Sequence, residues 1–316
     1  MSATPATPPP FLASPEAYAE LFDSVDTFLL DCDGVIYHGP VVVPGVKRVL
    51  ALMRARGKKI IFVTNNATKS RRMYKTTFDK LGIEAHENEI FGSGYASAVY
   101  MSRILKFPAD KRVYVLGEKG LEEELDSVGI KHCGGTDPED RVFIPSMDFS
   151  YFTPDPTIGA VLCGFDSGIN YKKLGKAFSY LRDDPNVHFL LTNQDKVFPT
   201  HGTFYPGSGS LSAPLVFALQ GKREPTIIGK PNKPMMDAII AEHQFDPARA
   251  LMVGDNLLTD IAFGNNSGLR TLLVMGGVTH KDQIYGDKPS DILPTFVVES
   301  LGDLAVLDGQ PAEATA

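Results

Sequence analysis

The chain of 316 residues is 43% hydrophobic and 22% charged, a globular composition that excludes a largely disordered, collagen-like or fibrous protein. Its 31 Lys and Arg residues against 38 Asp and Glu residues give a formal net charge of −7, which disfavours nucleic acids and anionic membranes as partners. Its three cysteines include no CxxC pair, which disfavours a disulfide framework or a zinc ribbon and favours a reducing compartment. No stretch approaches about 18 uninterrupted apolar residues, so we expect no membrane helix and place the protein in the cytoplasm.

The first 15 residues are rich in proline and contain no Lys or Arg. They lack the basic and apolar regions of a secretory signal. We therefore expect a disordered or loosely ordered start over residues 1–20.

Strand and helix patterns alternate through the rest of the chain. Short runs of β-branched and aromatic residues predict strands, and apolar residues at helical spacing, closed by glycine, predict helices. The outer parts of the chain carry strands at 27–30, 58–63, 226–228, 250–253 and 271–275, and helices that begin near 46, 70, 234 and 258. The middle carries a second series, with strands near 112–117, 157–165 and 188–195 and helices near 120–128, 171–181 and 210–219. This order predicts an α/β fold with a mostly parallel sheet and a second domain inserted into the first.

Polar clusters follow several of these strands, at the edge of a parallel sheet where ligands bind. Asp31 and Asp33, with Gly34, come directly after the first strand. Two carboxylates this close repel each other unless a cation or a shared proton relieves the repulsion. The alternative interpretation is a turn built from Asp and Gly. A calcium loop is disfavoured because Val35 and Val42 occupy ligand positions of an EF-hand.

Two further clusters could contact an anion. Thr64, Asn65 and Asn66 follow the strand at 58–63, and their hydroxyl and amide groups can donate to phosphate oxygens, although a helix cap or turn is the alternative. Lys230 lies in a Gly-Lys-Pro sequence, where a solvated charge is the alternative. It is not a Walker A lysine, because proline follows it in place of Ser or Thr.

The fourth cluster is acidic. Asp255 and Asp260 follow the strand at 250–253 in the sequence GDNLLTD. Their carboxylates could cap the helix that begins there, or they could complete a magnesium site of oxygen ligands.

Taken in order, DCDGV, VTN, GKP and GDNLLTD resemble the four motifs of the haloacid dehalogenase-like phosphatase superfamily. Longer segments, such as LLDCDGVIYHG and MVGDNLLTDIAFGNNSG, resemble its branch of 4-nitrophenylphosphatases and phosphoglycolate phosphatases, as do TNQDKVFP and YPGSGSL in the insert. The resemblance runs from about residue 25 to residue 304. It implies a Rossmann-like, doubly wound parallel-sheet core over 21–107 and 223–316, with an inserted α/β cap domain over 108–222.

The resemblance also implies a mechanism. Asp31 would be the nucleophile that forms an aspartyl-phosphate, and Asp33 would be the general acid and base. An acid at the position of Asp33 favours phosphate esters over haloacids, because an alkoxide needs protonation to leave and a halide does not. Mg²⁺ would be bound by Asp31, the backbone carbonyl of Asp33 and Asp255, with Asp260 holding water on the metal.

By the same resemblance, Thr64, Asn65 and Asn66 would hold phosphate oxygens together with backbone N–H groups near Gly34. Lys230 would pair with both the phosphate and the nucleophile.

The cap would select the substrate, and Asn193, Asp195 and Phe198 are the candidate specificity residues. The expected substrates are small phosphorylated metabolites, chiefly 2-phosphoglycolate, and 4-nitrophenyl phosphate. The resemblance further implies a homodimer formed through the cap. Alternatives are a pyridoxal-phosphate or protein phosphatase with the same chemistry, a phosphotransferase, and a non-catalytic binding module. The full set of acids and Lys230 disfavours the binding module.

Overall fold

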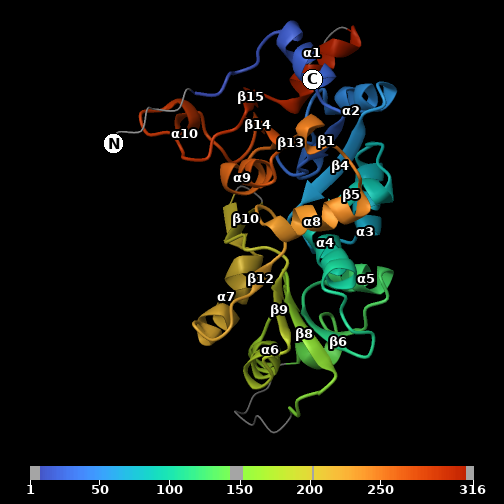
Figure 1. Ribbon diagram of the computed structural model, residues 1–316, viewed down its shortest axis with the longest axis vertical. Helices are drawn as coiled ribbons and strands as arrows, with labels where there is room; N and C mark the ends of the chain where they lie inside the picture. The colour runs from blue at the N-terminus through green and yellow to red at the C-terminus, as the bar shows by residue number, and fades with distance from the viewer. Residues whose placement is uncertain (1–7, 143–151, 201–202, 311–316) are drawn as a thin grey trace. The chain divides into compact units, whose positions relative to one another are not determined.

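The computed structural model describes residues 8–142, 152–200 and 203–310, which fold into two compact units (Figure 1). The core unit comprises the described residues of 1–64, 75–90 and 243–316, and the insert unit comprises those of 65–74 and 91–242. None of the helices within these described ranges is long and apolar enough to cross a membrane.

A six-stranded sheet forms the centre of the core unit, in the order β15-β14-β13-β1-β4-β5. Its strands are β1 (Thr27–Leu30), β4 (Lys59–Thr64), β5 (Ile90–Gly92), β13 (Ala250–Gly254), β14 (Arg270–Val274) and β15 (Phe296–Val298). β1 is parallel to both of its neighbours, β13 and β4, and its four residues are all buried, as expected for a central parallel strand. The chain leaves β1 for β4 on one side and returns to β13 on the other, which creates a doubly wound sheet with a switch point beside β1.

Helices and short strands complete the core unit. They are α1 (Pro15–Asp23), α2 (Val46–Ala55), α9 (Ala262–Asn266), α10 (Asp282–Tyr285), the 3-10 helix Leu301–Asp308 and the hairpin of β2 (Tyr37–His38) and β3 (Val41–Val42). The helix α3 (Arg71–Lys80) passes from the insert unit into the core unit. In α2, the buried residues Val46, Val49, Leu50 and Met53 repeat at helical spacing, so one face of this helix contributes to the core.

The start of the chain is more ordered than expected. The backbone N–H of Val297 donates to Pro10, and that of Leu12 donates to the carbonyl of Val297, so this segment extends the sheet beyond β15. Ser14 then caps α1 by accepting from the N–H of Ala17. Residues 8–20 therefore differ from the loosely ordered start that we expected, because hydrogen bonds and a capped helix fix them. The remainder of that segment, residues 1–7, lies outside the described residues.

The insert unit contains a second parallel sheet, in the order β12-β9-β8-β6-β7. Its strands are β6 (Arg112–Leu116), β7 (His132–Gly134), β8 (Ile158–Cys163), β9 (His188–Leu191) and β12 (Thr226–Ile227). Alternate residues of β6 enter two apolar clusters: Tyr114 and Leu116 join one, and Val113 and Val115 join the other. The sheet is therefore covered on both faces.

The insert unit also contains several helices, some of which cover these two faces. They are α4 (Ser93–Val99), which continues as a π-helical segment Tyr100–Ile104, α5 (Lys119–Ser127), α6 (Tyr171–Asp183), α7 (Ser208–Leu219) and α8 (Lys233–Glu242). Residues of α6 and α7 enter the cluster that contains Tyr114, and residues of α4 and α5 enter the cluster that contains Val113. A separate hairpin pairs β10 (Val197–Thr200) with β11 (Thr203–Pro206). The expected α/β fold of parallel sheets with flanking helices is confirmed.

The contacts divide the chain at positions that differ from the expected domain boundaries. β12 pairs with β9, so the strand at 226–228 belongs to the sheet of the insert unit and not to the core sheet. Its hydrogen bonds continue beyond the strand, from the N–H of Ile228 to Leu191 and from that of Gly229 to Thr192. A cap domain over 108–222 stays a prediction.

Candidate active site

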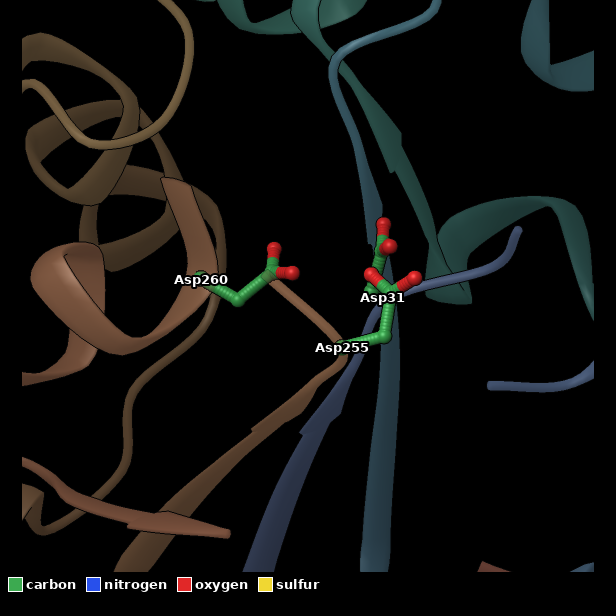
Figure 2. A group of neighbouring side chains, drawn as sticks. All are labelled: Asp31, Asp255 and Asp260. Carbon is green, nitrogen blue, oxygen red and sulfur yellow. The ribbon is translucent and has the colours of Figure 1, made fainter. Parts of the chain in front are cut away.

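Three carboxylates converge at the carboxyl edge of the core sheet. Asp31 follows β1, Asp255 follows β13, and Asp260 lies in the π-helical turn Leu257–Ile261. Each offers an oxygen atom, and these oxygens lie within 4.8 Å of one another (Figure 2). The parallel pairing explains why Asp31 and Asp255 lie close together, because β1 and β13 are direct neighbours and end at the same edge of the sheet.

Backbone hydrogen bonds fix the carboxylates of Asp255 and Asp260 and the main chain at Asp31. The N–H of Asp31 donates to the carbonyl of Val253 at 2.9 Å, which extends the ladder between β1 and β13 by one bond. Asp255 Oδ2 accepts from the N–H of Val278 at 2.9 Å. Asp260 Oδ2 accepts from the N–H of Asn256 at 3.2 Å. The side chains of Asp255 and Asp260 are therefore held by backbone N–H groups, and Asp31 is positioned through its own backbone.

Glycines make room for Asp255. A Cβ atom on Gly34 would lie 2.3 Å from Asp255 Oδ2, and one on Gly277 would lie 1.8 Å from it. Gly34 also has φ of +83°, a left-handed conformation that glycine adopts without strain. The Gly that follows Asp33 is thus required both by the turn and by the close approach of the acid.

The chemistry of this group of acids fits a hard divalent cation. Asp255 and Asp260 are almost fully buried and Asp31 is half-buried, so their mutual repulsion is poorly screened by solvent. Carboxylate oxygens are the ligands that Mg²⁺ prefers, and the cluster contains no sulfur or imidazole that would favour zinc. Asp31 and Asp255, two expected ligands, are brought together, and Asp260 joins them.

Asp33 occupies a tight loop. The N–H of Gly34 donates to Tyr37 at 2.9 Å, and that of Ile36 donates to Cys32 at 2.9 Å. This loop leaves the side chain of Asp33 exposed while Cys32 is buried. An exposed carboxylate two residues from Asp31 can exchange protons with a reacting group or with solvent.

A second polar cluster lies within the insert unit, centred on Asn65. Asn65 Nδ2 donates to both carboxylate oxygens of Asp195, at 3.2 Å each, and to the carbonyl of Lys230 at 3.1 Å. The carbonyl of Asn65 accepts from Asn193 Nδ2 at 2.8 Å and from Ser93 Oγ at 2.5 Å. β9 and β12 are parallel neighbours, so the residues that follow them lie side by side at one edge of the sheet.

The remaining predicted residues differ in their surroundings. Thr64 ends β4 and is buried, and Lys230 is 3% exposed, which does not fit a merely solvated charge. Asn66 is exposed, and its Oδ1 accepts from both the N–H and the hydroxyl of Thr68, an Asx turn. Phe198 contacts Phe165 edge to face, with ring centroids 5.3 Å apart.

Comparisons with known proteins agree with this geometry. Residues 28–131 match the family model described as haloacid dehalogenase-like hydrolase, and residues 227–304 match one described as HAD-hydrolase-like. A 4-nitrophenylphosphatase of Schizosaccharomyces pombe is 50% identical, over 93% of this chain and 98% of the relative. Phosphoglycolate phosphatase 2 of Arabidopsis thaliana is 41% identical, over 96% of this chain and 99% of the relative.

The chain belongs to the haloacid dehalogenase-like hydrolases. The structure agrees, since the p-nitrophenyl phosphatase of Archaeoglobus fulgidus superposes with a TM-score of 0.72 and 29% identity, over 89% of this chain and 98% of the other. The membership expected from the four motifs is confirmed.

Several residues beside these two separate polar clusters escaped the sequence analysis. Ser93 and Thr192 are buried polar residues beside Asn65 and Asn193, and Thr279 contacts Asp255 by donating its N–H to the backbone carbonyl at 3.1 Å. Their roles depend on which segments the fold brings together. The Gly-Gly pair at 276–277 was a usable signal, because paired glycines often mark a close backbone approach.

Proposed function

We propose that this hydrolase cleaves phosphate monoesters of small metabolites with the help of Mg²⁺, through an aspartyl-phosphate on Asp31. The observation that carries the proposal is the group of Asp31, Asp255 and Asp260, whose carboxylate oxygens lie within 4.8 Å of one another. These acids stand in the motif positions of a family whose relatives include phosphatases.

In the proposed reaction, a carboxylate oxygen of Asp31 attacks phosphorus and the bond from phosphorus to the ester oxygen breaks. Asp33 gives its proton to the departing alkoxide. A water molecule then attacks the phosphorus of the aspartyl-phosphate and loses a proton to Asp33, which releases inorganic phosphate and restores both carboxyl groups. The exposed position of Asp33 supports this exchange of protons.

Asp31, Asp255 and the backbone carbonyl of Asp33 would hold the magnesium ion, and Asp260 would support them. When bound, the ion offsets the negative charge of the phosphate and of the attacking carboxylate. Thr64, Asn65, Asn66 and Lys230, with backbone N–H groups near Gly34, would bind the phosphate oxygens.

The substrate class is part of the proposal. We assign small phosphorylated acids such as 2-phosphoglycolate as preferred substrates, with 4-nitrophenyl phosphate as a convenient artificial one. Phe198 stays the specificity candidate that its surroundings support, because its ring lies among Phe165 and Tyr205 at an apolar pocket. Pyridoxal phosphate and phosphoproteins are the alternative substrates.

Steady-state hydrolysis tests this function. We expect wild-type protein with Mg²⁺ to release phosphate from 2-phosphoglycolate and 4-nitrophenyl phosphate, and chelation of the metal to abolish turnover. The Asp31→Asn variant should be inactive, since it lacks the attacking carboxylate. Glycerol 3-phosphate, which has no carboxylate, is the matched compound for acid selectivity. Turnover by Asp31→Asn at the wild-type rate would contradict the mechanism, and a preference for phosphopeptides would favour the alternative.

We also propose that two copies associate through the insert unit. Helix α7 turns Ala213, Pro214, Phe217 and Ala218 to one exposed side, at helical spacing and without a charge. The neighbouring hairpin adds the exposed side chains of Phe204 and Tyr205. An uncharged apolar face of this kind is typical of an interface between protein copies.

Light scattering during size exclusion checks the association. The wild-type chain should elute as a dimer, and Phe217→Glu should elute as a monomer because the new charge would be buried in the interface. Val41→Glu, a change at a 63% exposed valine of the core unit, should leave the dimer intact. A dimeric Phe217→Glu protein would place the interface elsewhere.

For the location, we propose the cytoplasm. Cys32, Cys133 and Cys163 are all described, and no disulfide joins them. Thiols of this kind persist in reducing compartments.

A further inference from the structure

The side chain of Asn65 has an unusual set of contacts for a residue expected to bind phosphate. A neutral amide has two N–H groups to donate. One faces the two oxygens of Asp195 at 3.2 Å, and the other faces the carbonyl of Lys230 at 3.1 Å. Both donors are therefore used inside the insert unit, and the Asn65 side chain connects two loops.

We propose that Asp195 is a positioning residue for phosphate binding: its carboxylate fixes the amide of Asn65, and through it the backbone at Lys230. This inference rests on the proposed function. It gives Asp195 a role that differs from the expected one, in which the residue selects among substrates.

The negative charge of Asp195 favours one orientation of the Asn65 side-chain amide. An ionised carboxylate accepts hydrogen bonds and cannot donate them. If the amide of Asn65 were flipped, its oxygen would face the two oxygens of Asp195 and repel them. The observed orientation leaves Asn65 Oδ1 buried without a hydrogen-bond partner among the described residues, beside Gly229. A buried unsatisfied oxygen is unfavourable, so other contacts must hold the amide this way; the carboxylate of Asp195 and the carbonyl of Lys230 supply them.

Gly229 makes this packing possible. A Cβ atom on Gly229 would lie 2.6 Å from Asn65 Oδ1 and 2.6 Å from the carbonyl of Thr192. The backbone just before Lys230 therefore runs directly against the amide, and the N–H of Gly229 donates to Thr192 at 2.8 Å. A shift of the amide would move this strand end, and Lys230 with it.

The loop that carries Asp195 is itself fixed. Asn193 Oδ1 accepts from the N–H of Asp195 at 3.0 Å, while Asn193 Nδ2 donates to the carbonyl of Asn65 at 2.8 Å. Asn193 is 3% exposed. These bonds join Asn65, Asn193 and Asp195 into one closed network. Asp195 thus contacts Asn65, a residue expected to hold the phosphate group that every substrate shares.

The ratio of the kcat/KM values for two substrates distinguishes a positioning residue from a specificity residue. We expect Asp195→Ala to lower kcat/KM by about 10- to 100-fold for 2-phosphoglycolate and for 4-nitrophenyl phosphate alike, leaving their ratio unchanged. The inhibition constant of inorganic phosphate should rise in step. Asp195→Asn keeps one acceptor oxygen, so its kcat/KM should fall less than that of Asp195→Ala. Gln194→Ala, a change at an exposed neighbour, should match the wild type in kcat/KM for both substrates and in the inhibition constant of phosphate.

A double-mutant cycle tests whether Asp195 acts through Asn65. In an Asn65→Ala background, Asp195→Ala should cause little further loss, because the amide that it positions is gone. If Asn65→Ala is inactive or unfolded, the comparison of Asp195→Asn with Asp195→Ala by phosphate inhibition decides instead.

Two results would overturn the inference. One is a changed substrate ratio in Asp195→Ala, as expected of a specificity residue and as we expect for Phe198→Ala. The other is an unchanged inhibition constant for inorganic phosphate. A wild-type protein that hydrolyses no phosphate monoester would instead refute the proposed function, and the two failures are thus distinct.

Discussion

At the scale of single residues, three consecutive residues of the loop after β1 differ in their exposure to solvent. Asp31 is half-buried among acids, Cys32 is fully buried, and Asp33 is exposed. The turn after β1 directs Cys32 into the core, while its two acidic neighbours stay nearer the surface. The spacing of the two acids is thus what allows both to reach one reacting group.

Gly34 offers a test at this scale. Gly34→Ala should lower kcat/KM and weaken activation by Mg²⁺, because the new Cβ would displace Asp255 Oδ2, which would lie 2.3 Å away. It should also reduce the free energy of unfolding by about 1 kcal/mol through backbone strain. Kinetic titration with Mg²⁺ and chemical denaturation measure the two effects.

Gly57→Ala is the matched control. Gly57 has φ of +65°, but a Cβ atom there would meet nothing within 4 Å. This variant should show a similar loss of stability and unchanged kinetics. If both variants lost activity equally, the close approach to Asp255 would not matter.

At the scale of elements, regular periodicity made most of the structure predictable. The strands at 27–30 and 250–253 and the helices near 120–128 and 171–181 were found from sequence because their apolar residues repeat clearly. Helix α4 was missed, since its sequence SGYASAV is rich in small residues with weak helix preference. The hairpin of β10 and β11 was missed because its residues are largely exposed, without alternation.

A buried ion pair fixes α6 within the insert unit. Lys173 Nζ donates to Asp166 Oδ2 and to the carbonyl of Gly135, at 2.6 Å each, and both charged side chains are fully buried. Asp166→Asn should lower the free energy of unfolding by about 3–5 kcal/mol, because it leaves the ammonium group of Lys173 without a counter-charge. Chemical denaturation followed by circular dichroism measures the change.

The same substitution in an exposed pair is the control. Asp183 pairs with Arg182 at the surface, so Asp183→Asn should leave the unfolding midpoint almost unchanged. An Asp166→Asn protein as stable as Asp183→Asn would show that the buried pair is replaceable.

At the scale of the whole molecule, the predictable part of the site is the part carried by neighbouring strand ends. The family resemblance implied that Asp31 and Asp255 meet at one magnesium site, and each follows a buried strand of one parallel sheet. The cluster around Asn65 could not be predicted, since it depends on β12 joining the insert sheet beside β9. That pairing is a tertiary contact, and strand propensity alone does not assign a short strand to one sheet.

The central claim is that Asp31 becomes phosphorylated during turnover. The Asp33→Asn variant should accumulate this species, because it lacks the base that activates water. We would mix it with 4-nitrophenyl phosphate and Mg²⁺, quench in acid, and map the peptides by mass spectrometry. Our account predicts a phosphoryl group on Asp31 that hydroxylamine removes, and none in Asp31→Asn. A phosphoryl group on another residue, or full wild-type turnover with no labelled peptide, would contradict it.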